Sequence, residues 1–204
     1  MNQSNILENR FPGRRAALKR EILEQALHCF NDLGVEATTI DAIKARCDTS
    51  VGAIYHHFGN KEGILSALFF AAMDDQRQQL ERELAGANNL REAVFCIIES
   101  YLDWVTANRE WARFLYQARS PLAKGPFQQE LKDRNIQNYQ KLKEQLIGLG
   151  KGDINIVQPF EMLFSLIIGP SENYCRAWLS GRVKTSPQEY RKEFAESAWR
   201  SLKR

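Results

Sequence analysis

Apolar residues recur at spacings of three and four along most of this chain, the pattern of helices that bury one face. No stretch shows the alternation of apolar and polar residues that a half-buried strand requires. The sequence therefore predicts an all-α protein. The expected helices lie at about 14–33, 40–47, 51–58, 61–84, 90–107, 108–119, 127–147, 156–179 and 187–202.

Glycine and proline mark the predicted breaks between these helices. Gly34 stands where a helix C-terminal cap prefers glycine. The run from Ser120–Pro121 to Gly125–Pro126 is expected to separate two helices. Gly169–Pro170 is expected to kink or break the helix at 156–179, because proline lacks the backbone donor and clashes with the preceding turn.

Two of the predicted helices are very short and are joined by a tight polar turn, Asp48–Thr49–Ser50. Thr38 or Thr39 can cap the first of them, and Ser50 can cap the second. Their apolar residues are too few to keep them helical alone, so they need the long helix 14–33 as a support. This arrangement is a helix-turn-helix, which places its second helix in the major groove of DNA.

The surface of the second short helix suits contact with DNA. Gly52 and Ala53 are small and let the backbone approach the groove floor, while Tyr55 and His56 can reach phosphates or base edges. Lys61 follows the helix cap Asn60 and stands beside a helix N-terminus that itself attracts phosphate. The predicted DNA-binding residues are Arg14, Arg15, Thr39, Ser50, Val51, Gly52, Ala53, Tyr55, His56 and Lys61.

At these positions the chain resembles the TetR family of transcriptional regulators. The resemblance spans about residues 14–68 and rests on Thr39, Ile43, Ser50, Gly52, Tyr55, His57–Phe58, Lys61–Glu62 and Leu65. The chain departs from the family pattern at Lys44, Asp48 and Thr49, where a small residue, a glycine and an aliphatic residue are usual, and at Gly63. We expect the long side chain of Lys44 to extend outward between the helices.

The resemblance also implies the organisation of the rest of the chain. It divides the protein into a DNA-binding domain with its N-terminal arm, residues 1–62, and a helical effector-binding and dimerisation domain, residues 63–204. The last two predicted helices are the candidates for a homodimer face, and the alternative is that they pack only within their own subunit. A dimer suits a palindromic operator on double-stranded DNA, because a single recognition helix touches few bases.

Five aromatic residues are candidates for an effector cavity. They are Trp104, Trp111, Phe114, Phe160 and Phe164. Aromatic residues at helical spacing also serve as ordinary core, so that alternative stays open. The expected effector is an apolar or aromatic small molecule.

Composition narrows the function classes. Of 204 residues, 44% are hydrophobic and 26% charged, as in a soluble globular protein. The net charge is only +3, and residues 1–62 hold eight basic against eight acidic side chains. The basic residues are clustered rather than abundant: Arg14, Arg15, Lys19 and Arg20 crowd one helix start, where contact with the DNA backbone or minor groove is expected.

The remaining chemistry argues for a cytoplasmic protein without catalysis. Cys29, Cys47, Cys96 and Cys175 show no paired spacing and are expected as reduced core thiols, with a redox sensor as the alternative. No signal peptide follows Met1, and no apolar run is long enough to cross a membrane. His56 and His57 point about 100° apart on a helix, so no metal site is expected. No catalytic residue set and no cofactor motif occur.

Two functions remain. The first is a dimeric transcriptional repressor that a small apolar or aromatic ligand releases from DNA. The second is a DNA-binding adaptor of the same fold that a protein partner controls and that has no ligand cavity. An all-helical enzyme is the third class, and nothing in the sequence favours it.

Overall fold

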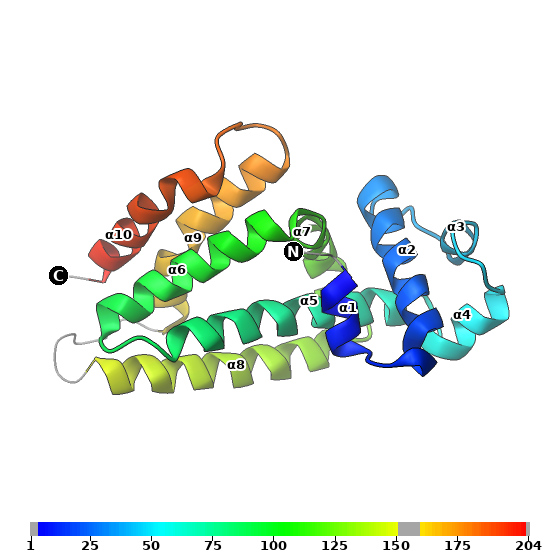
Figure 1. The fold of residues 1–204 in the computed structure, drawn as a ribbon, viewed down its shortest axis with the longest axis horizontal. Helices are drawn as coiled ribbons and strands as arrows, with labels where there is room; N and C mark the ends of the chain where they lie inside the picture. Colours follow the sequence, from blue (N-terminus) through cyan, green and yellow to red (C-terminus); the bar gives the residue numbers. More distant parts are fainter. Residues whose placement is uncertain (1–3, 151–159, 203–204) are drawn as a thin grey trace. The chain divides into compact units, whose positions relative to one another are not determined.

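The computed structural model describes residues 4–150 and 160–202, and within them the regular elements are all helical, which confirms the all-α prediction (Figure 1). In chain order they are α1 (Ser4–Arg10), η1 (Arg14–Ala16), α2 (Ala17–Leu33), α3 (Ile40–Lys44), α4 (Val51–Phe58), α5 (Lys61–Leu84), α6 (Leu90–Ala107), α7 (Arg109–Lys124), α8 (Gln128–Leu149), α9 (Phe160–Leu179), η2 (Pro187–Tyr190) and α10 (Arg191–Ser201). The elements η1 and η2 are single 3₁₀ turns.

The chain forms two compact units. The first consists of residues 1–75 and 108–132, and the second of residues 76–107 and 133–204. Helix α7 belongs wholly to the first unit, although 33 residues separate it from the end of that unit's amino-terminal part at Asp75. The functional division at residue 62 that the sequence predicts is a different kind of boundary and stays a prediction.

The core of the first unit forms around α2. Its inner face buries Ile22, Leu23, Ala26, Leu27, Cys29 and Phe30. Ile43 of α3 and Ile54 of α4 are fully buried as well, so the two short helices do rest on a larger support. Helix α7 adds Phe114, whose ring centroid lies 5.6 Å from that of Phe30. Gly34 ends α2 with a φ of 86°, and its N–H donates to the Phe30 carbonyl, as the sequence predicts for a C-terminal cap.

A helix that the sequence analysis missed precedes this core. Helix α1 packs on α2 and leaves Ile6 and Leu7 only 4% exposed. Its last residue, Arg10, pairs with Asp74 of α5 at 3.4 Å. With seven residues, α1 is too short to be stable from its own propensity and depends on this docking.

The structure differs from two predicted interruptions. Helix α7 continues through Pro121 to Lys124, and α9 continues through Pro170, so the predicted break at 120–126 starts too early and α9 is not broken. Buried side chains flank both prolines: Leu122 follows Pro121, while Ile168 and Ser171 surround Pro170. Packing on both sides offsets the loss of one backbone hydrogen bond.

The second unit contains α6, α9 and α10, which lie side by side (Figure 1). Helix α6 buries nine residues against its neighbours. Arg191 at the start of α10 bonds Glu99 at 2.8 Å and Asp103 at 3.2 Å, both on α6. The Phe194 ring packs 5.4 Å from that of Tyr174 on α9. None of the helices within the described residues is both long and apolar enough to span a membrane.

Candidate nucleic-acid interface

Helix α4 has the surface expected of a recognition helix. Ser50 caps it, because its hydroxyl oxygen accepts a 3.1 Å hydrogen bond from the Ala53 N–H. Ile54 is the one residue of α4 that is fully buried. Gly52 and His56 are exposed, and Tyr55 is 50% exposed. The outward side of α4 is therefore small at its amino end and aromatic one turn later.

Helix α3 is capped as predicted but is shorter than predicted. Thr39 is the cap, accepting from the Ala42 N–H at 3.1 Å, whereas Thr38 is buried and donates to carbonyls of α2 and the residue after it. The helix ends at Lys44, so Cys47 lies in the turn and not in the helix. Arg46 N–H bonds Ile43 O and Cys47 N–H bonds Lys44 O, which tightens the chain after Lys44 into i→i+3 turns.

The turn accommodates the departures from the family pattern without strain. No non-glycine residue in the described ranges has a positive φ, so Asp48 adopts an ordinary backbone conformation. Its N–H donates to Glu21 Oε1 at 3.0 Å, and the Arg46 guanidinium bonds Asp32 Oδ2 at 2.7 Å. Lys44 is exposed, as expected.

Glu21 and Asp32, both on α2, were not among the predicted residues. They are eleven residues apart, which is close to three helical turns, so they share one face of α2. This spacing of two acidic residues is the sequence feature from which their shared role could have been predicted.

Lys61 is engaged within the protein. Its ammonium donates to the carbonyl oxygens of Val35 and Glu36, each at 3.0 Å, in the loop between α2 and α3. Asn60 caps α5 as predicted, with Oδ1 accepting from the Gly63 N–H at 2.8 Å. Lys61 therefore ties the start of α5 to the loop before α3, and one of its three N–H donors is left over.

The predicted basic cluster divides into two pairs. Arg14 and Arg15 are exposed on η1. In contrast, Arg20 donates to the carbonyls of Phe11 and Gly13 at 2.7 and 2.8 Å. The Lys19 ammonium lies 4.6 Å from the ring centroid of Phe11 and also stacks on Phe58 of α4. Of these four residues, Arg14 and Arg15 are the exposed ones.

Comparison with known proteins agrees with this geometry. Residues 22–68 match the family model of bacterial regulatory proteins of the tetR family, a range that contains α3, α4 and most of α2. Residues 22–68 of the chain therefore carry a DNA-binding domain of the tetR type. It is 33% identical over 99 residues to the HTH-type transcriptional repressor AcnR of Corynebacterium glutamicum, an alignment that covers 48% of this chain and 50% of AcnR. The chain thus spans about half the length of the curated TetR-family relatives it matches.

Solved structures extend the likeness in fold to most of the chain. The fatty acid degradation regulator FadR from Bacillus halodurans superposes with a TM-score of 0.77 at 17% identity, covering 94% of this chain and 99% of that one. FadR from Bacillus subtilis, solved in complex with stearoyl-CoA, gives a TM-score of 0.72 at 16% identity, covering 88% and 97%. At these identities the likeness shows the TetR-family fold alone.

The five residues predicted to bind an effector are not gathered in one described pocket. Trp111 and Phe114 are buried in the first unit and Trp104 is buried in the second. Phe164, in the second unit, is 40% exposed. The side chain of Phe160 lies outside the described residues. The effector assignment stays a prediction.

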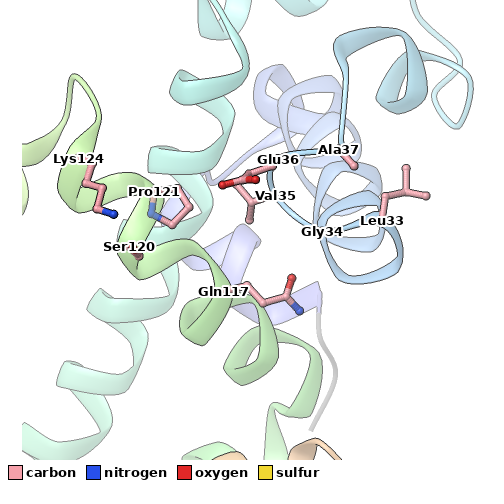
Figure 2. A pocket seen from close by; sticks show the side chains of 9 residues that line it. All are labelled: Leu33, Gly34, Val35, Glu36, Ala37, Gln117, Ser120, Pro121 and Lys124. Atoms are coloured by element: carbon pink, nitrogen blue, oxygen red, sulfur yellow. The ribbon is translucent and has the colours of Figure 1, made fainter.

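The first unit contains a different hollow, of about 630 Å³ (Figure 2). It lies between the α2–α3 loop and the carboxyl-terminal part of α7. None of the five predicted aromatics lines it; its walls are Leu33, Gly34, Val35, Glu36, Ala37, Gln117, Ser120, Pro121 and Lys124. Leu33, the last residue of α2, is 49% exposed here.

The cysteines have the properties of protonated thiols. Burial raises the pKa of all four, to about 11 for Cys47 and about 12 for Cys175. A thiol must ionise to react readily, so these values count against the alternative of a redox sensor. Among the described residues, no cluster of three or more His, Cys, Asp or Glu could hold a metal ion.

Proposed function

We propose that this TetR-family chain is a sequence-specific DNA-binding transcriptional repressor that acts as a homodimer on a palindromic operator. The observation that carries the proposal is the capped helix α4, which turns small and polar residues to solvent while Ile54 fixes it to a three-helix core. The likeness to the transcriptional repressor AcnR supports the direction of control.

We propose different roles for these contacts. Ser50, Val51, Gly52 and Ala53 form the first turn of α4, where the small side chains permit close approach to base edges. Tyr55 and His56 follow on the exposed side of the next turn. The remaining contacts would reach the DNA backbone and position the helix. They are Arg14, Arg15, Thr39 and Lys61.

Gly52 offers the sharpest test. A Cβ atom at Gly52 would meet only Ser50 Oγ, at 3.8 Å, so the fold has room for a side chain there. Gly52→Leu is expected to keep helical content and melting temperature while losing operator binding at least a hundredfold, because the leucine would stand between α4 and the groove. Fluorescence anisotropy with duplexes selected from a random pool by the parent protein measures the loss. Normal binding by this variant would show that another face meets DNA.

We further propose that a small apolar or aromatic ligand releases the repressor. The complex of Bacillus subtilis FadR with stearoyl-CoA supports a ligand of apolar character for this fold. Moving an equilibrium from 1:99 to 99:1 requires about 5.5 kcal/mol of difference between the ligand affinities of the two states. Helix α5 is the natural lever, because Lys61 at its amino end is bonded to the loop before α3.

Ligand control is tested by titrating the protein–operator complex with stearoyl-CoA and with a panel of hydrophobic and aromatic carboxylic acids. Release is expected for at least one member at concentrations that leave the protein folded. Phe164→Ala is expected to blunt release without changing operator affinity, since Phe164 is partly exposed and outside the first unit. A complex that no member of the panel releases would contradict ligand control and favour the partner-controlled adaptor.

A further inference from the structure

The turn between α3 and α4 is held from outside by side chains of α2. Glu21 Oε1 accepts from the Asp48 N–H at 3.0 Å, and Asp32 Oδ2 accepts from the Arg46 guanidinium at 2.7 Å. A third contact joins the Cys29 thiol to the Ala42 carbonyl at 3.6 Å. Polar side chains of α2 thus contact both α3 and the turn that follows it.

These contacts matter because little else fixes the amino end of α4. Only Thr49 and Ser50 lie between Asp48 and the first residue of α4, so the position of the Asp48 amide determines where α4 begins. Ile54, the single fully buried residue of α4, lies in the middle of the helix. Val51, at the amino end, is only partly buried.

We propose that Glu21 is a positioning residue for the recognition helix, acting through the Asp48 amide. The inference rests on the proposed DNA-binding function and adds to it a residue that does not itself touch DNA. By holding the turn, Glu21 sets the direction in which the first turn of α4 enters the groove. Specific binding depends on that direction more than non-specific binding does, because base-edge contacts require precise placement and phosphate contacts are more tolerant.

The effect of losing the negative charge of Glu21 can be distinguished from the effect of losing its hydrogen bond. A carboxylate near a polyanion repels it, so removing the charge alone strengthens or leaves unchanged the binding to any DNA. Loss of the hydrogen bond acts in the opposite direction and on the operator only. Glu24 provides the matched control: it lies on the same helix, is exposed, and makes no hydrogen bond or ion pair to any described residue.

The experiment compares Glu21→Ala, Glu21→Gln and Glu24→Ala in the full chain, with a selected operator duplex and an unrelated duplex of equal length. Glu21→Ala is expected to weaken operator binding about tenfold per half-site, the size expected for one charge-assisted hydrogen bond, and not to weaken binding to the unrelated duplex. Glu21→Gln retains an acceptor oxygen and is expected to stay within about threefold of the parent. Glu24→Ala is expected to bind like the parent.

A second measurement reports on the turn without DNA. Amide hydrogen exchange of Asp48 is expected to be faster in Glu21→Ala than in the parent, and close to the parent in Glu21→Gln. The higher helix propensity of alanine at position 21 offsets part of the lost hydrogen bond, so only a small drop in melting temperature is expected. If the parent binds its operator and Glu21→Ala binds it equally well, the positioning role is overturned while the proposed function stands. If the parent binds no duplex specifically, both are overturned.

Discussion

Basic side chains in the first unit fall into two groups at the residue scale. Lys19, Arg20 and Arg46 are occupied by rings, carbonyls or a carboxylate of the same unit, whereas Arg14 and Arg15 are exposed. A guanidinium bonded to two carbonyls contributes to the fold and is less available to phosphate. Residue type alone does not separate these groups, because the separation depends on partners at least seven residues away and, for Lys19, as far away as Phe58.

Lys61 is bonded within the unit and also keeps one donor for phosphate, which leads to a two-part prediction. Lys61→Ala removes two bonds to the carbonyls of Val35 and Glu36 and is expected to lower the free energy of unfolding by about 1–3 kcal/mol. Its third donor and the adjacent start of α5 remain for phosphate, so the slope of log K against log salt is expected to fall by roughly one per half-site. Denaturation and salt-dependent anisotropy measure the two effects.

Lys124 is the control for this variant. It is an exposed cation of the same unit, on the last turn of α7, and makes no ion pair with a described residue. Lys124→Ala is expected to change neither quantity. A lower stability of Lys61→Ala with an unchanged salt slope would make Lys61 a purely structural residue.

At the scale of elements, the connection between α4 and α5 is unusually close. A Cβ atom at Gly63 would overlap the carbonyl oxygen of Phe58 and lie 3.1 Å from its carbon. The obstruction is backbone, which cannot rotate away as a side chain can. Glycine at this position therefore lets α5 begin directly against the end of the recognition helix.

Gly63→Ala is expected to push α4 and α5 apart at this link and to cost about 1–3 kcal/mol of unfolding free energy. Because α4 must move, operator affinity is expected to fall as well. Gly169→Ala is the matched control: it is also within a helix, a Cβ there meets nothing within 4 Å, and alanine is expected to add up to about 1 kcal/mol of stability. Urea denaturation compares the two, and equal stability of Gly63→Ala and the parent would contradict the close approach.

The helices also show which boundaries the sequence predicts and why it fails to predict others. Helices α5 and α6 begin and end where their apolar periodicity and flanking polar residues predict, because those signals are local. Pro121 and Pro170 were expected to interrupt helices, but buried neighbours keep the chain helical. Among the side chains of α1 that the structure describes, only Ile6 and Leu7 are buried, too few for a periodic pattern, and the helix depends on its contacts with α2 and Asp74.

The same reasoning applies to the candidate site. The caps Thr39, Ser50 and Asn60 are confirmed, since capping depends on residues three positions apart. The roles of Glu21 and Lys61 depend on partners 27, 26 and 25 residues away. A sequence pattern does not specify such partners; the packing of α2 against α3 and the loop does.

At the scale of the whole molecule, the two units divide the chain differently from its order in sequence. Residues 108–132 return to the amino-terminal unit, where the Asn31 amide donates to the Glu110 carbonyl at 3.0 Å and Phe114 meets Phe30. Trp111 is fully buried in this unit. Trp111 therefore belongs to the hydrophobic core of this unit. Replacing its side chain with a smaller one is expected to lower the stability of the unit, so stability is measured before any effect on ligand release is interpreted.

Dimerisation is the last property to test, and it is tested at two aromatic residues of the second unit that are both partly buried. Trp178 of α9 and Phe194 of α10 are both predicted at the dimer face, but the Phe194 ring packs on Tyr174 of its own subunit. Phe194→Glu is therefore expected to lower the stability of the subunit itself.

Trp178 is only partly buried within its own subunit. In a dimer, Trp178→Glu would bury an unpaired charge between subunits, at a cost of roughly 3–5 kcal/mol. We expect sedimentation to show folded monomers of Trp178→Glu at concentrations where the parent is a dimer. Operator affinity is then expected to collapse although the first unit is unchanged, because one recognition helix alone contacts too few bases. If Trp178→Glu instead sediments as a stable dimer with parental operator affinity, the two subunits meet through a different face.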